Sequence, residues 1–276
     1  LWRHVDRRLT PRLEERQRID DRLSFRRRST GTTSMTSKTA NPRGRRKKTV
    51  GEDPQNQLNK DTIIAAALAL IDREGLEKCS LRNLANSLGV YPTAIYWYVS
   101  SRELLLSEVL AKVLEQVAPQ PQERWQDYLR ATLVNCHNAV HQHPNVAPLL
   151  GAQLVSNTRT DFKLVEGVLA ALQQAGFSGP SLAGAYNTFI AALAGFTTLE
   201  FAPLPENTEA WQQQVQESLQ AVDAEQHPTL AQNMDQLSNR GFSLRWQNGV
   251  HAPLHESFAF YVDTFLCGLE TLASRR

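Results

Sequence analysis

The sequence predicts an all-α fold in which a small helix-turn-helix module precedes a larger helical domain. From Leu58 onward, apolar residues recur almost without interruption at the spacing of one helix face. No alternating strand pattern competes with them, and Gly and Pro residues divide the chain into segments of helix length. The 276 residues are enough for a small domain joined to a medium one.

The first 57 residues differ from the rest of the chain in composition. They contain few apolar residues, and residues 1–60 hold 17 Lys and Arg against 7 Asp and Glu, whereas residues 61–276 hold 13 against 21. Such a segment cannot bury enough apolar surface to offset the entropy of ordering it. We therefore expect a disordered basic tail over residues 1–57, of which residues 1–34 are either native tail or a gene-model extension before Met35.

Three helices are predicted after the tail. The first spans residues 60–74, because apolar residues repeat along one face and Gly75 supplies the left-handed residue that ends a helix. The second begins after Ser80, a good N-cap, and ends at Gly89. The third begins at Pro92, which suits a first helical turn. Two short helices joined by a tight turn form a helix-turn-helix.

Beyond this module the chain predicts a second helical domain over residues 105–276. Helical stretches are expected at 102–117, 123–142, 145–156, 160–175, 180–202, 208–225 and 253–273. Proline and glycine residues punctuate these stretches. The segment from Pro203 to Pro253 is polar and rich in Gln, so we expect a partly mobile insert there.

The third predicted helix offers a face suited to reading DNA. At 100° per residue, Thr93 and Trp97 point away from the apolar pair Ile95 and Val99. Ala94, Tyr96 and Tyr98 lie on the flanks. In the major groove, apolar groups touch thymine methyls, and Arg82 on the preceding helix is placed to donate two hydrogen bonds to guanine. The alternatives are that Trp97 packs against the first or fourth helix and that Arg82 is solvated or binds a phosphate.

The helix-turn-helix module, residues 58–104, has no net charge, because five basic residues balance five acidic ones. Affinity for DNA depends on neutralised phosphates, so this module needs positive charge from elsewhere. We predict that a basic run in the tail supplies it as a flexible arm that enters the minor groove. The arm consists of Arg43, Arg45, Arg46, Lys47 and Lys48. The alternative is a tail that only improves solubility.

Composition and motifs argue against several other classes of protein. The three cysteines are far apart and odd in number, which gives neither a disulfide framework nor a paired zinc or redox motif. We find no run of about 18 uncharged apolar residues and no secretory signal, so we expect a cytoplasmic protein with no membrane partner. Phosphate-binding and nucleophile-elbow motifs are missing, and we expect no cofactor. An all-α enzyme with paired carboxylates in its core is kept as an alternative.

Two pairs of histidines stand at the i, i+4 spacing that some zinc sites use. They are His137 with His141 and His251 with His255, and His143 follows the first pair. Neither pair encloses the glutamate of a metalloprotease motif, and the cysteines are scattered. We therefore expect no metal site, and surface or capping roles for these histidines.

The series of motifs from Leu58 to Leu106 resembles the amino-terminal module of the TetR family of bacterial transcription repressors. In order, the motifs are Gly-Leu-Glu at 75–77, Arg-x-Leu-Ala at 82–85, Leu-Gly-Val at 88–90 and Tyr-Trp-x-Val at 96–99. A fainter similarity to the carboxy-terminal domain of the tetracycline-repressor branch continues at residues 125–130, 174–177 and 267–270. The resemblance implies contacts with DNA bases or phosphates from Ser80, Arg82, Tyr91, Pro92, Ala94, Tyr96, Tyr98 and Arg102.

The same resemblance implies a ligand-responsive regulator, most often a repressor, that binds a palindromic double-stranded DNA operator as a homodimer at the bacterial nucleoid. Family members pair through a four-helix bundle, for which residues 181–201 and 258–272 are suited; the alternative is that both are core helices of a monomer. A small hydrophobic effector is expected to bind among the helices between about 105 and 200 and to release the DNA.

Two further expectations concern the ligand. Thr132, Cys136 and Leu150 stand where the tetracycline-repressor branch has drug and metal contacts, so we do not expect a tetracycline sensor. The alternative from another functional class is an effector-independent DNA-organising or adaptor protein.

Overall fold

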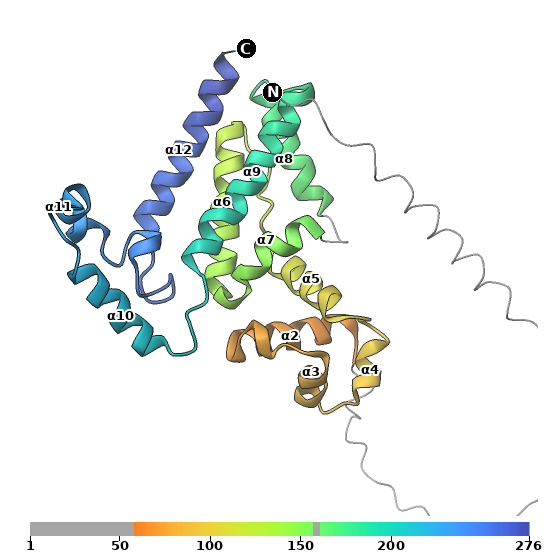
Figure 1. The fold of residues 1–276 in the computed structure, drawn as a ribbon. Coiled ribbons are helices and arrows are strands. Elements are labelled where there is room, and N and C mark those ends of the chain that lie inside the picture. The colour runs from red at the N-terminus through yellow and green to blue at the C-terminus, as the bar shows by residue number, and fades with distance from the viewer. Residues whose placement is uncertain (1–57, 157–160, 276) are drawn as a thin grey trace, which may run out of the picture. The chain divides into compact units, whose positions relative to one another are not determined.

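A computed structural model describes residues 58–156 and 161–275 of the chain, and within them all regular structure is helical (Figure 1). This confirms the predicted all-α fold. The basic tail predicted over residues 1–57, with its arm at residues 43–48 and the extension at residues 1–34, lies outside the described residues.

The amino-terminal module contains the three predicted helices. They are α2 (Lys60–Glu74), α3 (Leu81–Leu88) and α4 (Pro92–Tyr96), with a short 3-10 helix, η2 (Leu76–Lys78), before α3. The Asn59 side chain caps α2 by accepting a hydrogen bond from the Thr62 N–H at 2.9 Å. The bounds of α2 agree with the prediction, and residues next to the helix set both ends: Asn59 caps its start and Gly75 follows its last turn.

The remaining helices form the second part of the described chain. They are α5 (Arg102–Val113), α6 (Trp125–Gln142), η3 (Pro144–Val146), α7 (Ala147–Ser156), α8 (Phe162–Gln174), α9 (Gly179–Glu200), α10 (Thr208–Gln220), α11 (Pro228–Leu237), η4 (Phe242–Leu244) and α12 (His255–Ser274). The helix α5 is shorter than predicted, since the chain turns after Val113. The helix α11 was not predicted.

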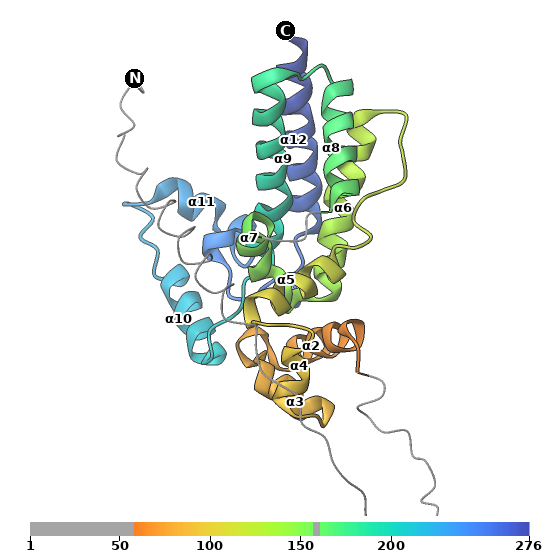
Figure 2. The same cartoon turned by 90° about the vertical axis from the view of Figure 1, so that its right-hand side faces the viewer.

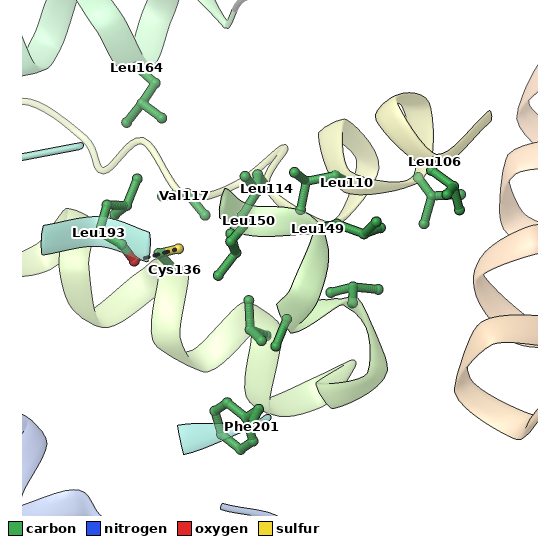
Figure 3. Close-up of a cluster of buried hydrophobic side chains, with 14 of the residues drawn as sticks. Leu106, Leu110, Leu114, Val117, Cys136, Leu149, Leu150, Leu164, Leu193 and Phe201 are labelled. Atoms are coloured by element: carbon green, nitrogen blue, oxygen red, sulfur yellow. Dashed lines mark hydrogen bonds between the residues drawn. The ribbon is translucent and has the colours of Figure 1, made fainter. Parts of the chain in front are cut away.

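Four long helices, α6, α8, α9 and α12, pack side by side, and α7 packs against α9 (Figure 2). Their buried side chains form the core, part of which is drawn in Figure 3. Thr132, Cys136 and Leu150 are completely buried in this core. The Thr132 hydroxyl donates to the Tyr128 carbonyl at 2.9 Å, which is a local helix contact. In this structure the three residues therefore pack in the interior.

The helix α5 connects the amino-terminal module to the body. It packs against α2 and against α7, and all six residues of Leu105–Leu110 are buried. Burial on every side of a helix means that neighbouring elements surround it completely. The middle of α5 is therefore fixed to both parts of the described chain.

A buried polar network ties the returning end of the insert to the body. The Glu200 carboxylate, at the end of α9, lies 2.7 Å from His137 Nε2 on α6 and accepts the Leu254 N–H at 2.8 Å. Arg245, also buried, donates to the carbonyls of Gln247 and Ala252. Burial alone would raise the pKa of Glu200, but the hydrogen bonds from His137 and Leu254 and the nearby positive charges hold it below the ordinary value.

This network corrects the prediction that the histidines lie at the surface. His137 is buried and its ring stacks on that of Phe258, with centroids 4.1 Å apart. The other member of its pair, His141, is exposed, as are His251 and His255. The prediction failed for His137 because its partner Glu200 is 63 residues away in the sequence.

The helix α9 spans 22 residues and is long and apolar enough to meet the criterion for a membrane span, contrary to our expectation that no segment would. Length and composition alone do not distinguish such a span from a core helix. Here α9 packs against α6, α7, α8 and α12, and it ends in the buried Glu200. Its apolar character is accounted for in part by these contacts.

The cysteines provide a test of the core. Cys79 and Cys136 are buried, and burial raises the pKa of both thiols, that of Cys136 to about 12. Because the thiolate is the reactive form, neither should react with a thiol reagent in the folded protein. In a Cys267→Ser variant, which removes the exposed cysteine, we expect no labelling by mass spectrometry before denaturation and two labels after it. Labelling of Cys136 in the folded protein would contradict this packing.

Candidate functional site

The turn between α3 and α4 sets the direction of the short helix α4. Gly89 ends α3 with φ +67° and ψ 28°, a left-handed conformation that glycine adopts at little cost. Pro92 then opens α4 at its first turn. Ile95 and Val99 are completely buried, so they anchor α4 and the turn after it to the core of the module. This arrangement confirms the predicted helix-turn-helix.

Large aromatic side chains are exposed along α4 and its ends. Trp97 is 87% exposed, and Tyr91, Tyr96 and Tyr98 are also exposed. Thr93 is exposed, while Pro92 and Ala94 are half-buried. The alternative that Trp97 packs against the first or fourth helix is therefore wrong for this structure. Exposed aromatic clusters of this kind mark surfaces that bind a partner.

Two polar residues of the predicted site lie at the start of α3. The Ser80 hydroxyl accepts the Asn83 N–H at 3.1 Å and so caps the helix, as predicted. Arg82 is exposed, and its guanidinium makes no ion pair or side-chain hydrogen bond within residues 58–156 and 161–275. Its five donors are therefore available to a ligand outside the chain.

Two other residues of the predicted site make contacts within the module. Arg102 donates from Nε to the Cys79 carbonyl at 2.7 Å and from a terminal nitrogen to the Leu76 carbonyl at 3.0 Å. The Tyr98 hydroxyl donates to the Leu58 carbonyl at 2.8 Å. Arg102 thus holds the connection between α2 and α3, a role that the sequence did not reveal.

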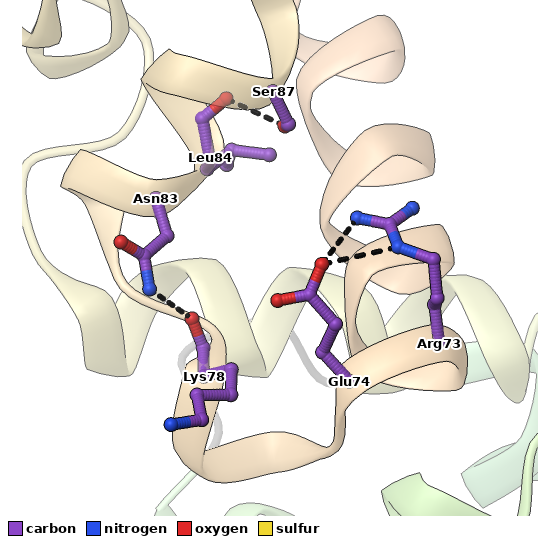
Figure 4. Close-up of polar contacts among 6 residues, drawn as sticks. All are labelled: Arg73, Glu74, Lys78, Asn83, Leu84 and Ser87. Atoms are coloured by element: carbon purple, nitrogen blue, oxygen red, sulfur yellow. Dashed lines mark hydrogen bonds and ion pairs between the residues drawn. The ribbon is translucent and has the colours of Figure 1, made fainter.

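The connection between α2 and α3 has further polar contacts (Figure 4). The Asn83 side-chain amide donates to the Lys78 carbonyl at 2.9 Å. The Ser87 hydroxyl donates to the Leu84 carbonyl at 2.8 Å within α3. The Asn83 bond and the two bonds from Arg102 satisfy carbonyls at the junction between α2 and α3, where unpaired backbone groups would be costly. They hold α3 in place beneath the exposed helix α4.

A cavity of about 720 Å³ lies among α2, α5, α8 and α9. Its walls include apolar side chains such as Ile64, Leu114 and Ile190. They also include four carboxylates, from Asp61, Glu108, Glu115 and Asp161, and two ammonium groups, from Lys112 and Lys163. The sequence predicted a site for a hydrophobic effector among residues of about 105–200, but the charges in this cavity and the participation of α2 were not predicted.

Direct contacts join the module to the body at both ends of α2, one of them beside this cavity. Lys60 Nζ on α2 lies 2.6 Å from Glu108 Oε1 on α5. At the other end of α2, His143 Nδ1 lies 2.8 Å from Asp72 Oδ2, and the Asn145 amide donates to the Ile71 carbonyl at 2.9 Å. The position of α2 is therefore coupled to α5 and to the segment after α6.

The described residues contain no group of three or more His, Cys, Asp or Glu side chains arranged to hold a metal ion. The exposed rings of His141 and His255 approach each other edge to face, with centroids 6.4 Å apart. The i, i+4 pairs singled out in the sequence therefore do not assemble into a metal site in this part of the chain.

Two sequence families match the chain. Residues 63–109 match the family described as bacterial regulatory proteins, tetR family, and residues 118–251 match the family described as tetracyclin repressor-like, C-terminal domain. The first match contains the helix-turn-helix and its exposed aromatic residues. The second contains most of the body, including α8 and α9, two of the four helices that line the cavity.

Individual proteins show the same similarity. The tetracycline repressor protein class E of Escherichia coli is 38% identical over 127 residues, which are 44% of this chain and 59% of that protein. The chain thus matches about three fifths of the length of that relative. A crystal structure of BioQ with its natural double-stranded DNA operator is 28% identical, with a TM-score of 0.50, and the match covers 53% of this chain and 88% of that one. ActR of Streptomyces coelicolor, in complex with (S)-DNPA, has the same fold, with 20% identity, a TM-score of 0.59 and coverage of 78% and 98%.

Proposed function

Because the chain belongs to the TetR family of bacterial regulatory proteins, we propose that it is a homodimeric transcriptional repressor that a small molecule releases from a palindromic operator. The observation that carries the proposal is the exposed aromatic face of α4, with Trp97 at its end. The relative BioQ, whose structure contains its double-stranded DNA operator, supports DNA as the partner. The regulator would act in the bacterial cytoplasm, where its operator is.

We assign DNA binding to residues 58–104 and effector binding and dimerisation to residues 105–276. Thr93, Trp97 and Arg82 are the proposed base-reading residues, because their side chains are exposed and carry methyl, aromatic or guanidinium groups that fit base edges. The other proposed contacts, to bases or phosphates, come from Ser80, Tyr91, Pro92, Ala94, Tyr96, Tyr98 and Arg102. Arg102 would also act indirectly, by holding α3 in place.

A second copy of the chain is the proposed partner of α9 and α12. The exposed residues of α9 are small or apolar over most of its length: Ala183, Gly184, Thr188, Ala191, Gly195 and Leu199. On α12, Phe260 and Leu272 are exposed. Small residues allow helices to approach closely, so these faces suit a four-helix bundle between two copies. The two α4 helices of such a dimer would then lie about 34 to 36 Å apart and face successive turns of the major groove.

Selection of DNA from a random pool by the full-length chain tests this proposal. We expect the recovered sequences to share a palindrome whose half-sites are about 10 base pairs apart, centre to centre. We also expect the protein to sediment as a dimer. Sequence-indifferent binding that no ligand changes would favour a DNA-organising protein, and the absence of any DNA binding would overturn the proposal.

The basic arm makes a separate prediction about salt. If Arg43, Arg45, Arg46, Lys47 and Lys48 contact phosphates, deleting residues 1–49 should reduce the magnitude of the slope of log K against log salt by up to about 4.5 per arm. Fluorescence anisotropy with the selected operator at several salt concentrations measures this slope. A chain that lacks only residues 1–34 keeps the arm and should keep the slope. An unchanged slope after the longer deletion would leave the tail with a solubilising role.

A further inference from the structure

We infer that the cavity among α2, α5, α8 and α9 is the effector site and that its ligand is a cationic amphiphile whose positive nitrogen replaces Lys60 at Glu108. This inference rests on the proposed function, since it names the effector class of the proposed repressor. It is carried by the size of the cavity, the charge of its walls and the contact that Glu108 already makes.

The cavity has the size and the surface of a small-molecule site. Its volume of about 720 Å³ lies within the range of about 300–1,000 Å³ that is typical of ligand pockets. Leu114, Leu164 and Leu193 in its wall also belong to the hydrophobic core (Figure 3). Tyr186 adds an aromatic face from α9. A ligand with an apolar body would therefore find apolar walls anchored in a rigid core.

The charged groups in the wall favour a positively charged ligand. The carboxylates of Asp61, Glu108, Glu115 and Asp161 outnumber the ammonium groups of Lys112 and Lys163. Lys112 is already paired with Glu115 at 2.6 Å. An anionic ligand would have only the Lys163 ammonium, or would have to compete with Glu115 for Lys112, and it would face four carboxylates in the same wall, so its binding is disfavoured.

Glu108 is the specific anchor for the cation. Its side chain is only 6% exposed, and a carboxylate so deeply buried needs a positive partner. The ammonium of Lys60 supplies this partner in the structure, at 2.6 Å, from a side chain that is itself 43% exposed. A ligand ammonium on an apolar body could take the same place at Glu108, while Lys60 would regain its full hydration.

This exchange would couple the ligand to DNA binding. Lys60 belongs to α2 of the DNA-binding module, and Glu108 belongs to α5, whose middle is enclosed by the body and by α2. Replacing Lys60 by a ligand removes an ion pair between them and places the ligand against Asp61 and Ile64 of α2. A ligand shifts an equilibrium only by its preference for one state, and the loss of this ion pair provides such a preference.

Three probes with the same tail and different heads test the ligand class: n-decylammonium and decanoate below their micelle concentrations, and 1-decanol below its solubility limit. Calorimetry on the full-length protein without DNA measures binding. We expect decylammonium to bind at least tenfold more tightly than either of the others. We also expect it to release the selected operator. Equal or tighter binding of decanoate or decanol would overturn the inference.

Two variants test the anchor. In Glu108→Gln, which keeps the size of the side chain, the preference for decylammonium should disappear. In Lys60→Met, which keeps an unbranched stem, decylammonium should bind about tenfold more tightly, because the Lys60 ammonium no longer competes for Glu108. Glu123→Gln, at an exposed position outside the cavity, is the matched control and should match the wild type.

The outcomes separate this inference from the proposed function. A preference for decylammonium that survives in Glu108→Gln, or that is unchanged in Lys60→Met, would overturn the inference even if the protein binds a palindromic operator as a dimer. Conversely, failure to select any operator would overturn the proposed function, whereas the calorimetric comparison of the three probes needs no DNA.

Discussion

Replacing Trp97 by alanine will weaken binding to the selected operator by about 100-fold and will hardly change the stability of the protein. Trp97 is 87% exposed at the end of α4, so its indole contributes little to the core. A good base contact is worth about 1–3 kcal/mol, and each dimer would lose the contact twice. Fluorescence anisotropy measures the affinity, and urea denaturation should show a change within about 0.5 kcal/mol.

Two further variants make the Trp97 result specific. Trp97→Phe keeps an aromatic ring and should recover a large part of the affinity. Leu237→Ala removes another exposed apolar side chain, on α11, and should leave binding unchanged. If Trp97→Ala binds the operator as tightly as the wild type, Trp97 does not belong to the DNA interface and the reading surface must be sought elsewhere on the module.

The largest effect on stability is expected for Glu200→Ala. This change removes a buried carboxylate that accepts hydrogen bonds from the His137 ring and the Leu254 N–H. A buried donor that loses its acceptor costs about 1–3 kcal/mol, and here both the His137 ring and the Leu254 N–H lose theirs. Denaturation in urea measures the loss. Glu270→Ala, at an exposed position on α12, should cost less than about 0.5 kcal/mol.

The same carboxylate predicts a dependence of stability on pH. The pKa of Glu200 is lower in the folded protein than its ordinary value of 4.5, so folding favours the charged form. Its stabilisation is complete above pH 4.5 and is lost as the pH falls through the lower folded-state pKa. The difference in unfolding free energy between wild type and Glu200→Gln should therefore shrink below pH 4.5. A constant difference down to pH 3 would show that the charge of Glu200 does not matter.

Local sequence signals predicted the parts of the fold that local interactions determine. The helix α2 spans the predicted residues because its apolar face and the Gly75 stop are local signals, and the Asn59 cap that the structure adds fixes its start. A helical wheel of α4 correctly predicts that Ile95 is buried and Trp97 is exposed, because a single buried face fixes the orientation of a short helix about its axis. The helix α11 was missed because Pro228 was interpreted as a break, although proline is also common in the first turn of a helix.

Contacts between residues far apart in the chain could not be predicted from the sequence. Arg102 lies in the TetR motif region, but only the fold brings its guanidinium to the carbonyls of Leu76 and Cys79. Lys60 and Glu108 are 48 residues apart, and neither has a neighbour in the sequence that marks it as special. The cavity could not be assigned for the same reason, since its wall combines side chains from four helices.

The enclosed middle of α5 has a mechanical consequence. A helix of 12 residues is about 18 Å long. When its middle is held, any tilt moves its two ends in opposite directions. A tilt of only about 5° would move one end by ~1.5 Å relative to the other, which is enough to spoil hydrogen bonds whose tolerance is a few tenths of an ångström. If the proposed function holds, a small change of contacts along α5 is therefore enough to disturb the geometry of the module at its start.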